Sequence, residues 1–588
     1  FLIPEQMLTS YDHFKVEIRN VKYFAEDGRV CPRTAIISFY DSKGKEIGNE
    51  LFGVIEKQDI FKMIEEGKDL ILDNLYISDF SLSAYRRIHN LDKKSPVRIN
   101  NLSAKNSFFE ATAATDFSHA LFNEGDISFE GAHFARGQVL FTGCDFGKGN
   151  VNFSNTLFRC GDIDFSGSVF DDGDFIFKNA VIKDGKKDFQ DIRFGNGEIN
   201  FSNTEFNSGE LLFINTHFGN GHFSFKVARI TGGKVDFHYA SFGDCDVSFE
   251  RTEFGNSKVD FRTVDFGSGK INFNRSIFGN GDVTFEGASC RSGKIQFKRV
   301  EMGAGHKNFS LMEMPNAEIN FEKTNFGDGI LTFNSSQFKV LCLRSCNFDH
   351  YVDLRLARAE ILDISDTIVR DIIDLEPYDF DVNIDVLNLT GMRLVGKIYI
   401  DWIRNRCYEK IMAQEDTTVR QKAEQFRTLK ENFSNIGKYS FEDKAYVAFR
   451  RLESKADLKE AVSKNKWSAL WSYPEYGFKW LVFDKIGLYA TSPGRVLVSV
   501  VLIWFFFGFI YYLIHLSGLG MTMSSVSNPD KLTPFVQSFY HSAIIFFTIG
   551  YGDVFPEGLS RLFSGIEGFI GVFMMSYFTV AFVRKVLR

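Results

Sequence analysis

The chain has 588 residues with a net charge of −7, and 24% of its residues are charged, a composition that suits a soluble cytoplasmic mass. Charges of both signs are mixed on the positions we expect to be exposed, so nucleic-acid mimicry is not indicated and we expect no nucleic acid as a partner. The eight cysteines lack metal-ligand spacing, and the sequence has no nucleophile triad, phosphate loop or metal-hydrolase motif, so we expect neither an enzyme nor a cofactor.

Residues 1–105 carry no internal repeat and indicate a mixed α/β module. Residues 14–18 and 34–39 alternate polar and apolar side chains, as the strands of a half-buried sheet do, and residues 57–66 favour a short helix. Such a module can be a sensor that binds an unknown ligand or protein. It can equally be a cap that protects the edge of the following domain from end-to-end pairing, which is the interpretation we favour.

The next part of the chain is dominated by regularly spaced phenylalanines. One series recurs every twelve residues from Phe129 to Phe333, and a second series, with some substitutions, follows each member by five residues. A small residue stands two positions before the second phenylalanine, and an apolar residue stands two positions before the first. Apolar residues two apart predict short strands. The glycines after the second phenylalanine predict turns with positive φ, as at Gly147, Gly149, Gly195 and Gly197.

Short strands joined by turns at a constant period predict a solenoid. The five-residue step, with its small residue, resembles pentapeptide-repeat proteins, whose four-sided β-helix points both large and small residues inward. The resemblance implies a right-handed β-solenoid over residues 106–400, built from a 12-residue, double-pentapeptide-like repeat. Because the second step has seven residues instead of five, we expect two repeats to close one coil of 24 residues, giving about nine Phe-rich coils.

The repeat is interrupted at two places 120 residues apart. At Lys187 and Lys307 a lysine replaces the apolar strand residue. The two positions can mark bulges or a surface site, but we favour plain irregularity of the repeat.

Residues 401–470 turn helical and predict a hairpin linker. Its first helix places apolar side chains on one face and ends at Gly437, which suits a C-terminal cap, and Ser440 with Asp443 then begins a second helix. Residues 471–492 combine aromatic side chains with lysines. This mixture predicts an interfacial amphipathic segment on the inner leaflet, placed to couple cytoplasmic movement to the membrane helices.

Two apolar segments near the C-terminus are long enough to cross a hydrocarbon core of ~30 Å. They span residues 496–516 and 559–583, and a short apolar helix over residues 534–547 lies between them. A helix too short to span, placed between two that do, is typical of a re-entrant loop. Basic residues flank the pair of spans, so the positive-inside rule predicts a multi-pass protein of the cell (inner or plasma) membrane with both termini in the cytoplasm.

Between the short helix and the second span the chain reads Thr548-Ile549-Gly550-Tyr551-Gly552-Asp553. A K⁺ ion leaves water only if oxygen atoms replace its hydration shell, and successive carbonyls of an extended T-x-G-Y-G strand supply them in stacked rings. Pointing these carbonyls the same way requires alternating right- and left-handed backbone, which Gly550 and Gly552 adopt without strain. We expect the Thr548 hydroxyl to form the innermost ring, and Tyr551 and Asp553 to hold the strand from behind by hydrogen bonds. The predicted K⁺ sites are Thr548, Ile549, Gly550 and Tyr551.

The order of helix, re-entrant loop and helix around this filter motif resembles the two-transmembrane potassium channels of the pore-loop family, over residues 493–588. The resemblance implies an all-α pore domain and a homotetramer, because each chain offers one filter strand and a pore needs four. Phe547 departs from the family, in which most members place a second threonine before the filter, so the polar floor of the cavity is altered. Where some members hold the filter aspartate with a carboxylate, residues 543–545 here are apolar.

Three residues of the second span are candidate gating residues. Gly571 lies about five turns beyond the filter, where the family often has a hinge glycine, and close packing between helices is an equal alternative. Phe578 and Phe582, one turn apart, form a hydrophobic constriction that closes by dewetting, or else pack against lipid or a neighbouring helix. Glu567, a carboxylate within the membrane, is expected to buttress the back of the pore.

The whole sequence therefore predicts a K⁺-selective channel with passive conduction, gated or regulated by its cytoplasmic N-terminal solenoid. One alternative is a membrane-anchored pentapeptide-repeat scaffold with a non-conducting pore, and another is a weakly selective cation channel. The expected partners are further copies of the chain, membrane lipids, and an unknown ligand or protein on the N-terminal domains.

Overall fold

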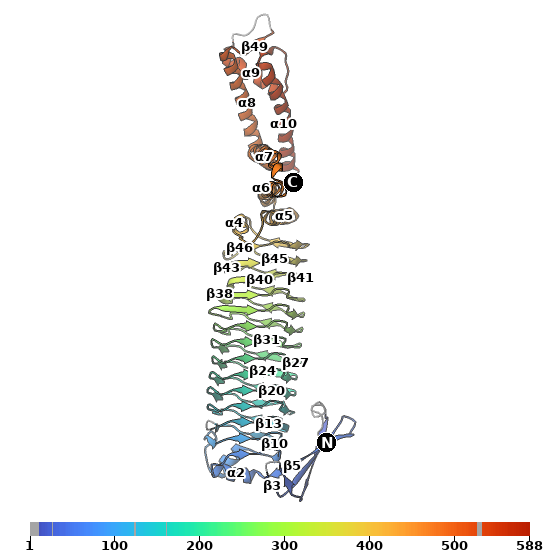
Figure 1. The fold of residues 1–588 in the computed structure, drawn as a ribbon, viewed down its shortest axis with the longest axis vertical. Coiled ribbons are helices and arrows are strands. Elements are labelled where there is room, and N and C mark those ends of the chain that lie inside the picture. The colour runs from blue at the N-terminus through green and yellow to red at the C-terminus, as the bar shows by residue number, and fades with distance from the viewer. Residues whose placement is uncertain (1–10, 26–27, 123–124, 160, 526–531, 588) are drawn as a thin grey trace. The chain divides into compact units, whose positions relative to one another are not determined.

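The computed structural model describes residues 11–25, 28–122, 125–159, 161–525 and 532–587. The chain divides into two compact units, Phe1–Gln414 and Glu415–Arg588, which we describe separately. The first unit is a β-solenoid, and the second is helical with two long apolar helices (Figure 1). The fold class predicted from the sequence, a solenoid followed by a helical pore-type region, is confirmed.

The solenoid has about 14 turns, and one of its faces is a 14-stranded sheet whose strands pair in parallel. In this sheet Val151 pairs with Phe175, and Phe175 pairs with Ile199, so equivalent residues are 24 apart. Each coil contributes up to four short strands, one to each face. The coil that begins at residue 151 shows the full set: β14 (Val151–Asn152), β15 (Leu157–Phe158), β16 (Ile163–Asp164) and β17 (Val169–Phe170).

The solenoid begins earlier than the predicted boundary at residue 106 and has more coils than the nine Phe-rich ones. Its first ladder strands are β6 (Leu70–Ile71) and β9 (Leu102–Ser103), which pair in parallel. Leu70 and Leu102 are buried at ladder positions without belonging to a phenylalanine series. At the other end the ladder reaches β46 (Ile384–Asn388), and the last strand is β48 (Lys397–Tyr399).

Phenylalanine rings fill the solenoid as stacked ladders. Phe129 lies 4.9 Å from Phe153 at an interplanar angle of 3°, and Phe141 lies 4.7 Å from Phe165 at 9°. The two ladders meet edge to face, with Phe129 and Phe141 5.7 Å apart at 77°. Because offset-stacked and edge-to-face pairs each add about 0.5–1.5 kcal/mol beyond area burial, every ring gains from several neighbours at once.

Where the residue two positions before the second phenylalanine carries a hydroxyl group, it makes a hydrogen bond between coils. The hydroxyl of Thr156 donates to the carbonyl of Phe129 at 2.8 Å, and that of Thr204 donates to Phe177 at 2.7 Å. A side chain here must be small enough to fit beside the rings, and a hydroxyl can satisfy the Phe carbonyl, a buried acceptor. The same bond recurs at Ser168, Thr216, Thr252, Ser276 and Ser336.

The corner glycines are required mostly for close stacking. Of the four glycines expected to have positive φ, Gly147 does, at +57°, but Gly149, Gly195 and Gly197 do not. A Cβ on Gly197 would lie 2.0 Å from the carbonyl oxygen of Gly173 in the preceding coil. The prediction of positive φ is therefore wrong at these three positions. Glycine is required there because the main chain of one coil corner lies directly against the main chain of the preceding coil and leaves no room for a side chain.

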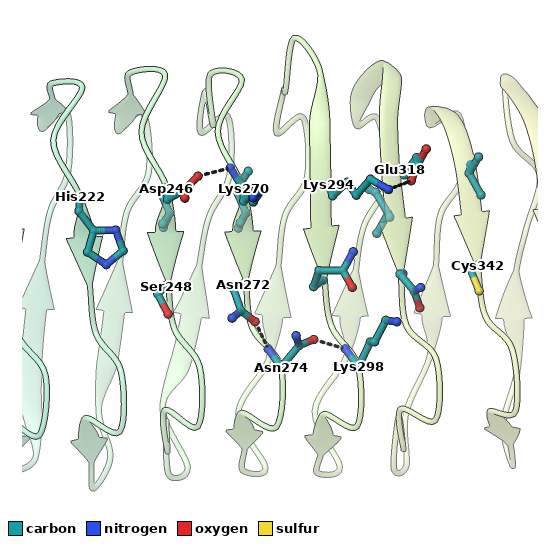
Figure 2. A pocket seen from close by; sticks show the side chains of 16 residues that line it. His222, Asp246, Ser248, Lys270, Asn272, Asn274, Lys294, Lys298, Glu318 and Cys342 are labelled. Carbon is teal, nitrogen blue, oxygen red and sulfur yellow. Dashed lines mark hydrogen bonds and ion pairs between the residues drawn. The ribbon is translucent and has the colours of Figure 1, made fainter.

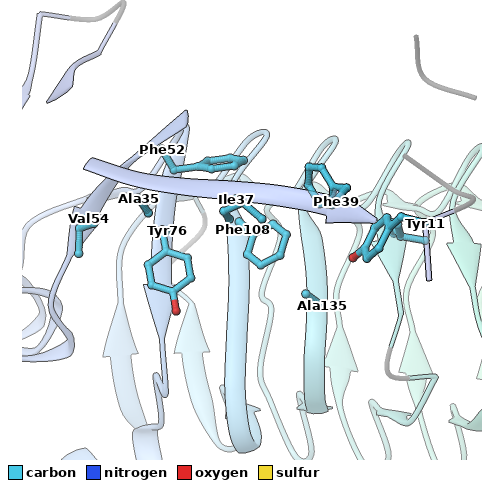
Figure 3. Packing of buried hydrophobic residues seen from close by; sticks show 10 residues of the cluster. Tyr11, Ala35, Ile37, Phe39, Phe52, Val54, Tyr76, Phe108 and Ala135 are labelled. Carbon is cyan, nitrogen blue, oxygen red and sulfur yellow. The ribbon is translucent and has the colours of Figure 1, made fainter. Parts of the chain in front are cut away.

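The N-terminal module adds a small sheet to the edge of the solenoid. The strands β1 (His13–Arg19), β4 (Thr34–Tyr40) and β5 (Glu46–Ile55) pair antiparallel. β5 also pairs in parallel with β7 (Leu75–Ser78), which in turn pairs with β10 (Phe108–Asp116). Figure 3 shows Ile37 and Phe39 of the module beside Phe108 and Ala135 of the first coils, in one buried cluster. The module also contains α2 (Lys57–Glu65) and α3 (Leu82–Ile88).

The two irregular lysines lie inside the solenoid wall. Lys187 continues a strand ladder between Ile163 and Leu211 and is only 1% exposed. Its Nζ donates to the carbonyls of Gly185, Asn207 and Ser208 at 2.9–3.0 Å. Lys307 is buried in the same way, with its Nζ bonded to the carbonyls of Gly303 and Asp328. Burial lowers the pKa of both lysines to about 8, so these positions are satisfied interior cations and neither bulges nor a surface site.

The second unit is built from helices. A hairpin of α5 (Val419–Asn435) and α6 (Tyr439–Lys464) comes first, with a Thr418–Gln421 capping box at its start. Gly437, at φ +74°, makes the turn between the two helices. The short α4 (Cys407–Met412) ends the first unit. The remaining helices are α7 (Ala469–Phe478), the π-helical η2 (Lys479–Ile486), α8 (Pro493–Ser517), α9 (Pro534–Phe546) and α10 (Ser560–Val586).

Candidate functional site

Two helices of the second unit are long and apolar enough to cross a membrane. α8 has a mean hydropathy of 2.4 and α10 of 1.7, each over an 18-residue window with few charges. Only 28% of the α8 window and 22% of the α10 window are buried. A core helix of a soluble protein would be mostly buried, so these exposed apolar surfaces fit a lipid environment.

The short helix α9 packs between the two long ones. Its N-terminus is capped by Thr533, whose hydroxyl accepts a hydrogen bond from the Val536 amide at 3.4 Å, and Pro534 occupies the first turn. A Cβ on Gly508 of α8 would lie 2.7 Å from the Phe539 ring, so this glycine permits close approach of α8 and α9. After α9 the chain turns back through residues 548–553, as a re-entrant loop does.

The backbone of this loop alternates between left- and right-handed conformations. Thr548, Gly550 and Gly552 have φ values of +55°, +65° and +74°, whereas Ile549 and Tyr551 do not have positive φ. This alternation is the geometry that turns successive carbonyls toward one side of a strand. At Gly550 and Gly552 it costs little, because glycine lacks a Cβ.

Residues 499–588 match the family model described as Ion channel. The match covers α9, α10, the loop between them and most of α8, so this part of the chain is an ion-channel domain and the protein is a membrane protein. Comparison with curated proteins and with solved structures gave no significant match.

The outer end of the ion-channel domain's loop is held by hydrogen bonds from two sides. Tyr540 of α9 donates its hydroxyl to Asp553 at 2.7 Å. Ser525 donates its hydroxyl to the Gly552 carbonyl at 2.8 Å and its amide to the Asp553 carbonyl at 2.8 Å. Ser525 follows β49 (Gly520–Ser524), which pairs antiparallel with β50 (Val554–Gly558) just after the loop. The loop is thus anchored to α9 and to the small sheet of β49 and β50.

The sequence shows that residues 543–545 offer no carboxylate to Asp553, but it does not identify the partner. In the structure the partner is the phenol of Tyr540, about one helical turn earlier. The sequence signal for this partner was Tyr540 itself, a polar side chain that stands one helical turn before the apolar residues 543–545. Tyr551, expected to hold the strand from behind, is 72% exposed in the single chain. The Thr548 hydroxyl donates to the Phe547 carbonyl at 2.7 Å.

A buried polar network ties the three helices of the ion-channel domain together. Glu567 of α10 is fully buried and accepts hydrogen bonds from Tyr511 of α8, at 2.7 Å, and from Ser542 of α9. Ser564 joins the same network, accepting from Tyr511 at 3.2 Å and lying 3.0 Å from the His541 ring nitrogen. Buried carboxyl groups are costly unless satisfied, and here one group is bonded to both neighbouring helices. Glu567 therefore fixes α8 and α9 against α10 behind the loop.

The structure places the three gating candidates on one helix. Gly571 is buried, and a Cβ there would lie 2.2 Å from the Phe546 carbonyl oxygen at the end of α9. This close approach requires glycine whether or not the helix bends there. Phe578 and Phe582 lie side by side on α10 with ring centroids 6.1 Å apart, and Phe582 is about half exposed.

Proposed function

We propose that the protein is a K⁺-selective channel whose filter is the strand from Thr548 to Asp553. The observation that carries this proposal is the alternating positive φ at Thr548, Gly550 and Gly552 in a T-x-G-Y-G-D sequence, directly after a re-entrant helix. Carbonyl oxygens aligned in this way replace the hydration shell of K⁺. The ion would be held by oxygens of Thr548, Ile549, Gly550 and Tyr551, and it passes without chemical change.

The proposed channel is a homotetramer. One chain supplies a single filter strand, and in that chain the loop side chains Ile549 and Tyr551 are exposed, as are many apolar side chains of α8 and α10. Four strands around an axis would bury these groups and surround the ion with carbonyls. Exposed apolar surface of this extent requires a partner or lipid, and the pore needs both.

The proposed orientation puts both termini in the cytoplasm of the cell membrane. Lys479, Lys485 and Arg495 precede or begin α8, and Arg584 and Lys585 end α10. Basic residues on one side of a pair of spans mark the cytoplasmic side. The loop would then open to the outside, with Asp553 near its outer mouth.

Lipid contact on the cytoplasmic side is proposed for the segment before α8. Three large apolar side chains stand close together in this segment and are at least 70% exposed: Trp467, Leu470 and Trp471. Large aromatic side chains on one helical face beside lysines suit the interfacial region of the inner leaflet. This stripe starts before residue 471, where the sequence placed the beginning of the segment.

The solenoid is proposed to regulate the channel, with its N-terminal module acting as a cap. The module extends the sheet at β7 by β5, β4 and β1, which removes the free strand edge that two solenoids would otherwise pair through. A ligand or protein that acts on the N-terminal domains is compatible with this role.

The test is K⁺ flux and reversal potential in liposomes that contain the purified full chain. We expect K⁺ current with little Na⁺ permeability, abolished by Gly550→Ala, because an added Cβ disfavours φ of +65°. The matched control is Gly565→Ala, where a Cβ meets no atom within 4 Å. Comparable K⁺ and Na⁺ permeability would establish a weakly selective cation channel instead. No current from an intact tetramer, together with partner capture that survives deletion of residues 493–588, would establish a scaffold.

A further inference from the structure

The cytoplasmic end of α10 is bonded to the helical hairpin that precedes the membrane helices. Arg584 Nη2 lies 3.2 Å from Asp443 Oδ1, and Lys585 Nζ lies 3.0 Å from Asp443 Oδ2. Asp443 belongs to the first turns of α6 and is largely buried. The Arg584 guanidinium also lies 4.4 Å from the Tyr446 ring, one turn further along α6. One carboxylate thus holds two cations at the end of α10, and an aromatic face supports one of them.

A strained turn just before α8 is held by the same end of α10. Leu488, Tyr489 and Ala490 all have positive φ, of 45°, 52° and 59°. Left-handed backbone is strained for a residue with a Cβ, so a run of three persists only where neighbours impose it. Two groups of α10 do so, since the Ala490 amide donates to the Tyr577 hydroxyl at 3.1 Å and Arg584 donates to the Tyr489 carbonyl at 3.4 Å.

The hairpin also grips the segment that leads into this turn. Arg451 of α6 makes a bidentate ion pair with Asp484 of η2, with N to O distances of 2.7–3.1 Å. Asp484 is buried whereas the Arg451 side chain is about half exposed, so the pair is partly shielded from water, and its bidentate geometry makes it specific. α6 therefore contacts both the entry to α8, through Arg451, and the exit from α10, through Asp443.

The contact region contains space into which side chains can move. A cavity of about 350 Å³ is lined by Tyr446, Arg450, Tyr489 and Tyr577, among other residues. Side chains beside the strained turn therefore have room to move, which close-packed side chains lack.

We propose that Asp443 is the positioning residue through which the α5–α6 hairpin sets the place of the α10 end, and hence the width of the pore at Phe578 and Phe582. This inference rests on the proposed channel function. The chain runs from the solenoid into α5 and α6, so a displacement of the hairpin reaches α10 through the Asp443 ion pairs. The strained turn at residues 488–490 favours release when these bonds weaken, because freeing it recovers the strain energy.

The test compares Asp443→Asn with Asp443→Glu in the full-length reconstituted protein. Asn removes the charge, and we expect faster amide hydrogen exchange over residues 578–586 and a change in K⁺ flux of at least about fivefold, the lower end of usual coupling energies. Glu keeps the charge and should restore most of both properties. The control is Asp457→Asn, a more exposed residue of α6 that pairs with Arg420 at 2.6 Å, which should leave both within about twofold.

The two readouts separate the possible failures. Unchanged hydrogen exchange in Asp443→Asn overturns the positioning role, even if the protein proves not to conduct. Faster exchange with unchanged flux in a conducting protein overturns the link to the pore. A wild type that passes no K⁺ refutes the channel proposal, while hydrogen exchange still decides the role of Asp443. If Asp443→Asn does not fold, Lys585→Gln, at a half-exposed site, removes one of the two ion pairs and should give a smaller change in both readouts.

Discussion

Tyr540 donates its phenolic hydrogen to the Asp553 carboxylate across 2.7 Å, joining the helix before the filter to the residue that ends it. The bond spans 13 positions of the chain and closes the re-entrant loop on itself. Together with the two hydrogen bonds from Ser525, it fixes the outer end of the strand that we propose selects K⁺.

Removing this hydroxyl should loosen the filter. We expect Tyr540→Phe to lower the K⁺ over Na⁺ permeability ratio several-fold, because the strand diameter is then less restrained, and the measurement is the reversal potential in mixed K⁺ and Na⁺. Tyr512→Phe is the control, since that ring packs on Phe535 away from the filter. Wild-type selectivity in Tyr540→Phe would show that the bond does not support the filter.

Gly571 offers a test between packing and bending. Gly571→Ala places a methyl group 2.2 Å from the Phe546 carbonyl, and such overpacking costs about 1–3 kcal/mol. We expect a lower thermal stability of the reconstituted protein, measured by its unfolding temperature. Gly565→Ala on the same helix meets open space and should leave stability unchanged or slightly higher. Reduced flux at full stability in Gly571→Ala would instead favour a hinge.

The Glu567 network predicts a graded series of stabilities. Glu567→Ala removes the carboxylate to which Tyr511 and Ser542 donate, leaves them only the Ser564 hydroxyl and the Trp504 carbonyl as acceptors, and opens a cavity. Glu567→Gln keeps an acceptor oxygen and should lose less. Thermal unfolding of the reconstituted protein measures both, and equal losses in the two variants would contradict a role based on hydrogen bonding.

The buried lysines predict a pH dependence of solenoid stability. Burial lowers the pKa of Lys187 and Lys307 to about 8, below the value of an unfolded lysine. Between about pH 8 and 10.5 the unfolded chain therefore binds more protons, so the solenoid becomes more stable as pH rises. Below about pH 8 both states are protonated, and the cost of burying the two charges is constant.

The measurement is the unfolding temperature of wild type and of a Lys187→Leu, Lys307→Leu variant at pH 7 and pH 9. Leucine stands at the equivalent position of the next coil, Leu211, so it should fit. We expect the variant to be the more stable at pH 7 and the difference to shrink at pH 9. Lys186→Leu, at an exposed neighbouring site, is the control. A difference that does not vary with pH would mean that the lysines bear no buried charge.

The sequence predicted the fold best where one residue type recurs at a constant interval. The 12-residue interval of Phe129, Phe141 and Phe153 predicts the coil, because identical environments recur in a solenoid. Early coils built on Leu70 and Leu102 gave no such signal, since leucine is common in every kind of core. The corner glycines were identified, but their reason, contact between coils, depends on residues 24 positions away.

The candidate site likewise has a part that the sequence predicts and a part that it does not. The loop at residues 548–553 and its flanking helices follow from local chemistry, so they can be predicted from a short stretch of residues. Contacts made by Tyr540, Asp443 and the turn at residues 488–490 depend on which helix faces which, and a polar side chain on a helix does not reveal its partner. Lys187 shows the same limit, because three carbonyl groups from two coils make its burial possible.

Because two repeats close one coil, the face at which the chain leaves the solenoid depends on whether the number of repeats is odd or even. Adding one 12-residue repeat preserves every phenylalanine interval, yet it moves the point at which the chain leaves the solenoid to the opposite face. Adding two lengthens the stack by ~4.8 Å and leaves that exit where it was. The 120 residues from Lys187 to Lys307 are five complete coils, an even count of repeats. Insertions and losses among the Phe-rich coils should therefore come as whole coils of 24 residues, because only whole coils keep the exit of the chain on the same face.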